Sequence, residues 1–147
     1  MKPRIAITAG DPAGIGPEIA AKAAASPRVR AVCEPIIYES TPSVPVPIGE
    51  VSPQAGRAAF DAVVRAVEDA RKGVVQGVAT APVNKAAFAA AGLGWKGHTD
   101  LLAHLCGVGQ VAMMFHSPKL RVVLATVHVP LRDVPRLLTR DLILGTL

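Results

Sequence analysis

Apolar positions along the chain form short unbroken runs that alternate with longer stretches in which they recur every three or four residues. The short runs predict strands at Arg4–Thr8, Cys33–Glu39 and Val74–Ala79. Before the third run, Ala and Val recur at helical spacing from Ser52, the expected N-cap, to a stop at Gly73. Strands that alternate with helices in this way are typical of an α/β fold.

The rest of the pattern predicts shorter elements. Three prolines and no helical period mark residues 40–49 (Ser40–Gly49) as a connector. Two runs joined by a short polar turn predict an antiparallel hairpin of Gln110–Phe115 and Arg121–Thr126. Helices are expected from Pro17 to about Ser26, from Lys85 to Ala91, from a Thr99 cap to Leu105, and from a Thr139 cap to Leu147.

The composition narrows the class of protein. The chain has 147 residues, of which half are hydrophobic and 18% are charged, so it can bury a core. Its net charge of +5 comes from scattered Lys and Arg, and only 3% of the residues are aromatic, so nucleic-acid binding is not favoured. No apolar run reaches the roughly 18–20 residues of a membrane span, and no secretory signal is evident. We therefore expect a cytoplasmic protein without a membrane partner, with Cys33 and Cys106 as buried free thiols.

Three polar loops follow the ends of apolar strands, at Ala9–Gly16, Thr80–Lys85 and Val127–Asp133. In α/β sheets ligands bind at the carboxyl ends of the strands, so these loops predict an active site. The first loop is neither a dinucleotide fingerprint nor a P-loop, because its glycine spacing differs and it lacks a Lys-Ser/Thr pair. It can equally be a tight structural turn. Lys85 can neutralise a phosphate or an oxyanion, or it can be a solvated lysine.

Two histidines are candidates for ligand binding. His98 and Thr99 stand at a predicted helix start, where an imidazole, a hydroxyl and main-chain N–H groups suit a phosphate or carboxylate, although Thr99 can simply cap the helix. His128 is expected to follow a buried strand and can bind a metal with Asp133 orienting it, or it can be a core histidine. His104 and His116 belong to no pattern, and we interpret them as structural or surface residues.

Five motifs in order carry a resemblance to a known family: GDPAGIGPE, TAPVNKAAF, GHTDLLA, VAMMF and RVVLATVHVPLRDV. Together they resemble the 4-hydroxythreonine-4-phosphate dehydrogenase family of vitamin B6 and pyridoxal phosphate biosynthesis. The resemblance implies an α/β/α sandwich similar to isocitrate and isopropylmalate dehydrogenases, in two lobes, with a homodimer partner completing the site. It also implies an oxidoreductase that uses NAD to oxidise and decarboxylate 4-phosphooxy-L-threonine to 3-amino-2-oxopropyl phosphate.

The same resemblance implies roles for particular residues. His98 and Thr99 match the substrate-binding pair of the family, and His128 matches the first of three histidines that bind a divalent metal such as Zn, Mg or Co. We infer that Asp11 and Lys85, whose loops would wall the cleft, are catalytic residues. No residue of this sequence is assigned to NAD.

The sequence departs from the family in two places. The stretch Tyr38–Ile48 is much shorter than the family's segment, and the chain ends soon after His128. We therefore expect residues 1–147 to be the N-terminal portion of a longer subunit and to show no measurable dehydrogenase activity alone. The apolar positions of the last helix would then lack partners and favour association. Two alternatives stay open: a dehydrogenase for a related phosphorylated hydroxy acid such as a threonate phosphate, and a non-catalytic module that binds a phosphorylated ligand.

Overall fold

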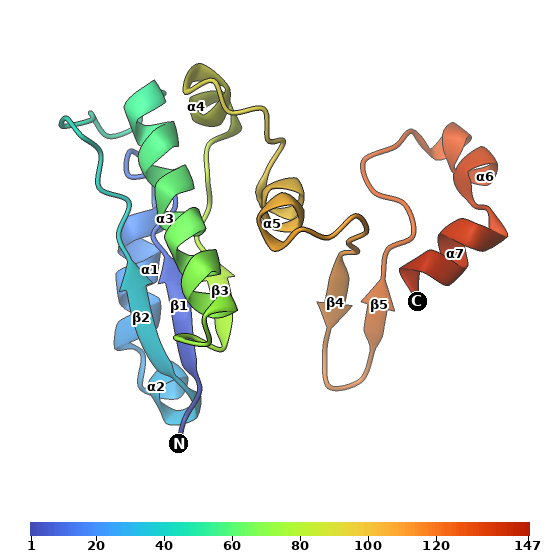
Figure 1. Cartoon of the computed structure of the whole chain (residues 1–147), viewed down its shortest axis with the longest axis horizontal. Helices are drawn as coiled ribbons and strands as arrows, with labels where there is room; N and C mark the ends of the chain where they lie inside the picture. The colour runs from blue at the N-terminus through green and yellow to red at the C-terminus, as the bar shows by residue number, and fades with distance from the viewer. The chain divides into compact units, whose positions relative to one another are not determined.

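The computed structural model describes all residues, 1–147, as two compact units, Met1–Leu105 and Cys106–Leu147. The first unit contains a parallel sheet of three strands, β1 (Arg4–Thr8), β2 (Glu34–Tyr38) and β3 (Gly77–Thr80), in the order β2-β1-β3 (Figure 1). This arrangement confirms the predicted α/β fold, with β1 at the centre of the sheet.

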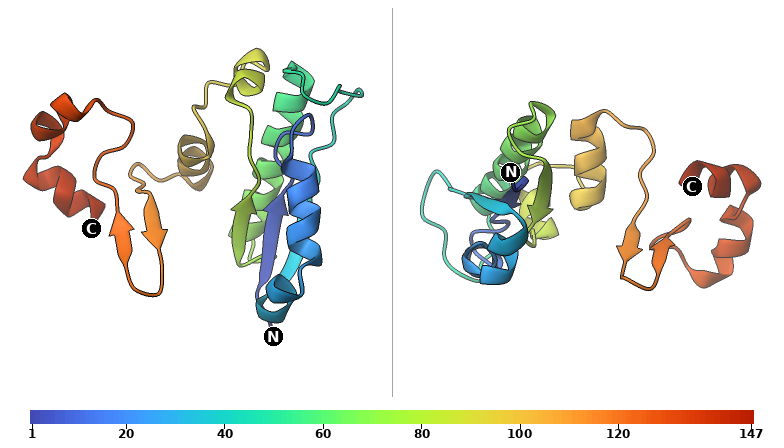
Figure 2. Two further views of the ribbon diagram at one scale, coloured as in Figure 1. Left: turned by 180° about the vertical axis from the view of Figure 1, so that it is seen from behind. Right: turned by 90° about the horizontal axis from the view of Figure 1, so that it is seen from below.

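Helices cover both faces of this sheet. On one face Ile7 of β1 packs with Ala20 and Ala24 of α1 (Gly16–Ala25), and on the other Ala6 packs with Ala66 of α3 (Pro53–Arg71). Figures 1 and 2 show α1 and α3 on opposite sides of the sheet. The layering follows from β1 itself, because successive side chains of a strand point to opposite faces and both faces of this strand are apolar.

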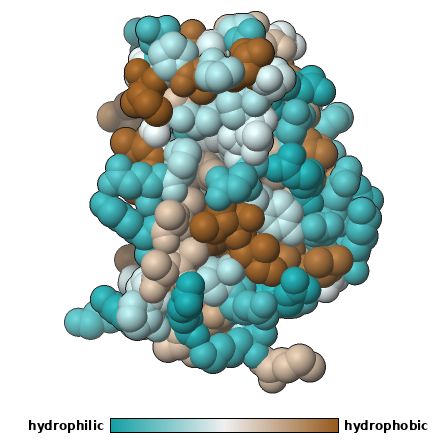
Figure 3. All heavy atoms as spheres, turned by 90° about the vertical axis from the view of Figure 1, so that its left-hand side faces the viewer, coloured by the Kyte–Doolittle hydropathy of each residue, from teal (hydrophilic) through white to brown (hydrophobic).

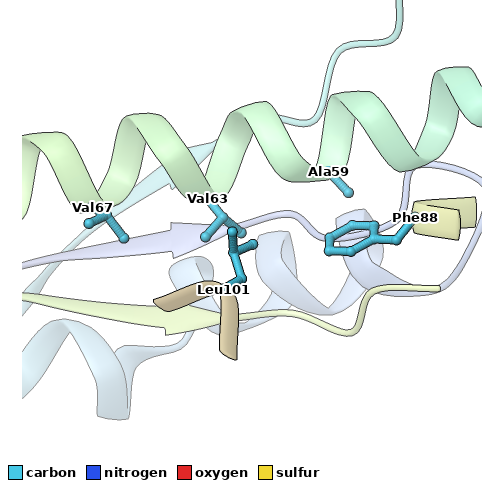
Figure 4. Close-up of a cluster of buried hydrophobic side chains, with 5 residues drawn as sticks. All are labelled: Ala59, Val63, Val67, Phe88 and Leu101. Atoms are coloured by element: carbon cyan, nitrogen blue, oxygen red, sulfur yellow. The ribbon is translucent and has the colours of Figure 1, made fainter. Parts of the chain in front are cut away.

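A second cluster of buried side chains lies beside α3 and joins it to two shorter helices, α4 (Lys85–Ala90) and α5 (His98–Cys106). Figure 4 shows the five buried residues of this cluster, namely Ala59, Val63 and Val67 of α3, Phe88 of α4 and Leu101 of α5. α3 and α4 come very close at Gly56, where an added Cβ would lie 2.1 Å from the carbonyl oxygen of Ala87. The cluster therefore fixes α4 and α5 against the long helix.

The second unit is small and exposed. It holds an antiparallel hairpin of β4 (Met114–His116) and β5 (Arg121–Val123), a 3₁₀ turn (Leu131–Asp133) and two short helices, α6 (Val134–Leu137) and α7 (Arg140–Thr146). None of its residues is buried.

Figure 3 shows the side of the molecule at the left of Figure 1, where hydrophobic residues form separate patches among hydrophilic ones.

Several local predictions are confirmed. β1 has the predicted bounds, Ser52 caps α3 by accepting the Ala55 N–H at 3.1 Å, and Thr139 caps α7 by accepting the Leu142 N–H at 3.1 Å. The hairpin is antiparallel as predicted, but its strands are shorter. Residues 40–49 contain no helix or strand.

Three predictions are wrong for identifiable reasons. The third strand begins at Gly77 and not at Val74, because the Val74 and Val75 N–H groups donate to the carbonyl of Asp69 and prolong the turn after α3. A helix that the pattern missed, α2 (Pro27–Val32), follows α1 directly, and it buries no residue that could have marked it. The thiols are not buried, since Cys33 is half-buried and Cys106 is exposed.

No helix is long and apolar enough to cross a membrane.

Candidate active site

The loops that follow β1 and β3 meet at the carboxyl ends of these neighbouring strands. The Asp11 N–H donates to the carbonyl of Pro82 at 2.9 Å. Gly10 makes this approach possible, because its φ is +71° and a Cβ there would lie 2.3 Å from the Pro82 carbonyl oxygen. The two loops are therefore held together by their main chains, as the strand-end rule predicts.

A pocket of about 520 Å³ lies between these loops. Asp11 and Lys85, the two residues predicted to be catalytic, both line it. The remaining lining residues are Gly14, Ile15, Pro82, Val83, Asn84 and Ala86. Most of this lining is apolar, so the carboxylate and the ammonium are the charged groups that a ligand in the pocket would meet.

Asp11 is a buried carboxylate without a cation. Its side chain accepts the Ala13 N–H at 2.8 Å, and the residue is only 6% exposed. The ion pairs of the structure join other residues, and none of them includes Asp11 or Lys85. The loop thus holds a charged group inside the protein by main-chain contacts alone, and the side that faces the pocket has no protein partner of opposite charge.

Lys85 is the first residue of α4, and its side chain is exposed. Asn84 fixes this helix start, because its Oδ1 accepts the N–H groups of Ala86 at 2.9 Å and Ala87 at 3.2 Å. Asn84 was not among the predicted caps, although an Asn before an Ala-rich helix is a recognisable N-cap signal. Lys85 reaches the next loop, since an added Cβ on Gly97 would lie 3.7 Å from its Cε.

His98 opens α5 and is half-buried. Its Nε2 is fully buried and has no hydrogen-bond partner in the protein. Burial lowers the pKa of the imidazole from its ordinary value of 6.5, so the ring is mainly neutral at pH 7. A buried ring nitrogen without a partner costs free energy unless a ligand supplies one.

The residues around His98 differ in part from the prediction. Thr99 does not cap the helix, because α5 already begins at His98, and Thr99 is exposed. Asp100 instead accepts the Lys96 N–H at 2.6 Å and closes the loop before the helix. A cap at Thr99 was expected because threonine is a favoured N-cap residue, whereas the hydrogen bond of Asp100 depends on how the preceding loop turns back.

His128 lies in the second unit, in a left-handed conformation with a φ of 54°. The prediction that it follows a buried strand is wrong, because β5 is exposed throughout and His128 is exposed too. Asp133, expected to orient it, pairs with Arg136 at 2.7 Å. The structure contains no group of three or more His, Cys, Asp or Glu side chains that could hold a metal ion. His128 therefore offers one imidazole donor.

The structure thus brings several predicted residues together in the first unit. Asp11 and Lys85 line one pocket, and Lys85 lies beside Gly97, which precedes His98 and Thr99. The other two histidines fit their predicted surface or structural roles: His104 is exposed and stacks on Trp95 with ring centroids 4.6 Å apart, and His116 is exposed in β4.

Comparison with known proteins gives consistent results. The family model described as "Pyridoxal phosphate biosynthetic protein PdxA" matches residues 7–147. The chain is 36% identical to a putative D-threonate 4-phosphate dehydrogenase of Symbiobacterium thermophilum, over 97% of this chain and 55% of the relative. It is 34% identical to a 4-hydroxythreonine-4-phosphate dehydrogenase of Geobacter metallireducens, over 99% and 55%.

Solved structures agree with the sequence matches. A 4-hydroxythreonine-4-phosphate dehydrogenase from Klebsiella pneumoniae superposes with a TM-score of 0.88 at 33% identity, covering 99% of this chain and 56% of that one. A terephthalate 1,2-cis-dihydrodiol dehydrogenase from Burkholderia xenovorans gives a TM-score of 0.67 at 29% identity, covering 97% and 54%. The chain therefore spans about half the length of the relatives it matches.

Proposed function

Because the chain belongs to the PdxA family of pyridoxal phosphate biosynthetic proteins, we propose that it forms part of a 4-hydroxythreonine-4-phosphate dehydrogenase. The whole protein would oxidise its phosphorylated hydroxy-amino-acid substrate with NAD and release carbon dioxide to give 3-amino-2-oxopropyl phosphate. The observation that carries this proposal for the present chain is the pocket that Asp11 and Lys85 share, with Lys85 approaching Gly97, the residue before His98.

His98 and Thr99 would bind the phosphate of the substrate. A neutral imidazole can donate the proton of one ring nitrogen in a hydrogen bond to a phosphate oxygen. The exposed hydroxyl of Thr99, the next residue, offers a second donor. The ammonium of Lys85 would add positive charge on the same side, where it can neutralise a phosphate or a developing oxyanion.

Asp11 and Lys85 would act as catalytic residues on the wall of the pocket that they share. Lys85 would stabilise negative charge as the substrate hydroxyl is oxidised and the carboxylate is lost. Asp11 would contact the substrate through the part of its carboxylate that faces the pocket. The mainly apolar lining around them leaves these two charges as the groups that orient a ligand.

NAD and a divalent cation, such as Zn, Mg or Co, are proposed cofactors of the whole protein. The cation would polarise the substrate oxygen, and His128 would supply one of its ligands. Its imidazole is exposed and without an ion-pair partner, which suits a metal donor, but the described side chains do not gather a complete ligand set around it. Residues that bind NAD are not assigned in this chain.

We also propose the wider setting that the family resemblance implies. Residues 1–147 would be the N-terminal portion of a two-lobed α/β/α subunit similar to isocitrate and isopropylmalate dehydrogenases. The whole protein would be a cytoplasmic homodimer. A second candidate substrate is D-threonate 4-phosphate, which is favoured by the 36% identity to the Symbiobacterium thermophilum relative of that name.

Ligand binding tests this proposal on the chain itself. Isothermal titration calorimetry with 4-hydroxythreonine-4-phosphate should show binding to the wild-type chain, and His98→Ala should weaken it by about tenfold or more, because a hydrogen bond to a charged group is lost. His104→Ala is the matched control, since this exposed imidazole faces Trp95 and not the pocket. Equal affinity of wild type and His98→Ala would contradict the proposed role of His98 in phosphate binding.

A further inference from the structure

We infer that Asp11 is a specificity-determining residue that recognises the ammonium group of the substrate, an inference that rests on the proposed function. The relatives fall into two classes by name, those that act on 4-hydroxythreonine-4-phosphate and those that act on D-threonate 4-phosphate. Both molecules carry a carboxylate at one end and a phosphate at the other. They differ at the carbon beside the carboxylate, which bears an ammonium in the first and a hydroxyl in the second.

Asp11 has no cation of the protein to balance its charge. The residue is 6% exposed, its carboxylate accepts one main-chain N–H at 2.8 Å, and it forms no ion pair. A buried carboxylate in such surroundings is costly unless a cation or further donors complete it. Because Asp11 lines the pocket, the missing cation can come from a ligand.

The pocket also contains a positive charge. Lys85 lines the same pocket and is not ion-paired to Asp11, so the two charges face a ligand separately. An amino acid carries an ammonium and a carboxylate on one carbon, and it can match such a pair with its ammonium toward Asp11 and its carboxylate toward Lys85. A threonate offers Asp11 only a hydroxyl, which donates a weaker hydrogen bond than an ammonium does.

Lys85 also connects the pocket to the proposed phosphate site. Its side chain approaches Gly97, and His98 follows Gly97 directly in the chain. The amino-acid end of one molecule can therefore occupy the pocket while its phosphate lies at His98 and Thr99. The pocket, of about 520 Å³, is large enough for the few heavy atoms of the amino-acid end.

Calorimetry with both ligands tests the inference on the 147-residue chain. The wild type should bind 4-hydroxythreonine-4-phosphate about 10- to 100-fold more tightly than D-threonate 4-phosphate, the range for one hydrogen bond between charged groups. Asp11→Asn keeps an oxygen that can accept the Ala13 N–H but loses the charge, so the ratio of the two dissociation constants should fall to near one. Asp61→Asn is the control, because this aspartate pairs with Arg57 on α3 and should leave the ratio unchanged.

A measurement without any substitution guards against a variant that does not fold. N-acetylated 4-hydroxythreonine-4-phosphate lacks the positive charge and should bind the wild type at least about tenfold more weakly than the free amine. If the wild type binds both phosphorylated ligands equally, or if Asp11→Asn keeps the wild-type ratio, the inference is overturned and the proposed function stands. If the wild type binds neither ligand, the proposed function fails and the inference fails with it.

Discussion

Replacement of Leu101 by alanine should destabilise the first unit strongly, because this residue connects α5 to the core. Leu101 is 0% exposed and lies in the same buried cluster as Val63 of α3 and Phe88 of α4 (Figure 4). The substitution removes three carbon atoms from a closed environment, and the surrounding helices can fill the space only in part. Leucine-to-alanine changes at such sites cost about 2–5 kcal/mol of unfolding free energy, and we expect about 3 kcal/mol here.

Urea unfolding followed by Trp95 fluorescence measures this loss. Trp95 is the chain's one tryptophan and packs against the same cluster, so it reports on the first unit. With an m-value of about 2 kcal/mol/M, a loss of about 3 kcal/mol lowers the urea midpoint by roughly 1.5 M. Ile48→Ala is the matched control, because it also removes three carbon atoms but from a side chain that is 80% exposed, and its effect should stay within about 0.5 kcal/mol.

A small effect of Leu101→Ala would contradict this role of the side chain. A loss below about 1 kcal/mol for Leu101→Ala, with the Ile48→Ala control unchanged, would mean that the α5 contact contributes little to the core. A larger loss for Ile48→Ala than for Leu101→Ala would show that the connector is packed and that Leu101 is not the anchor. Either result would also remove the structural reason for a fixed His98 at the start of α5.

Two further predictions concern a helix cap and a titration. Ser52→Ala should cost about 1 kcal/mol in the same urea assay, since it removes the acceptor of the Ala55 N–H, whereas the exposed Ser43→Ala should cost nothing measurable. Tyr38, the one tyrosine, should titrate above its ordinary pKa of 10.0 in an absorbance titration, because burial and the 2.6 Å hydrogen bond to Asp69 favour its neutral form. The stabilisation of the folded state by the neutral form of Tyr38 is complete below about pH 10 and is lost as the pH rises further. Asp69→Asn should move the midpoint of the tyrosine titration back toward its ordinary pKa.

Equal stability of Ser52→Ala and wild type would rule out the cap as a source of stability. An unshifted tyrosine titration, or one that Asp69→Asn leaves in place, would mean that Tyr38 does not keep this hydrogen bond in solution. The cap lies at the start of α3 and the Tyr38–Asp69 hydrogen bond near its end, so the two tests report on opposite ends of one helix.

The elements that the sequence predicted well are those determined by local chemistry. β1 is an apolar run with a glycine just after it, and Ser52 followed by proline is a strong helix start. The predicted bounds of β1 and the predicted start of α3 therefore agree with the structure. The start of β3 could not be predicted in this way. Val74 and Val75 have strand propensity, but their N–H groups bond to the end of α3, and this contact depends on how the turn at Gly73 folds back.

The candidate site shows the same division between local and distant effects. The convergence of the Asp11 and Lys85 loops was predictable, because both follow strands of one parallel sheet. The burial of Asp11, the contact of Lys85 with Gly97 and the unpartnered Nε2 of His98 were not. Each of these depends on residues far apart in the chain that meet only when the loops and helices of the first unit pack together.

The way in which Asp11 is held gives the pocket its chemical character. Gly10 lets the main chain of the first loop lie against Pro82, and the N–H of Ala13 binds the carboxylate, so the sheet and its loops fix the charge without the help of a cation. A lysine or arginine paired with Asp11 would have balanced the charge but would also have occupied the pocket. Because a main-chain N–H holds the carboxylate and no side-chain cation pairs with it, the position opposite Asp11 stays open. A positively charged group of a ligand can bind there and balance the charge of Asp11.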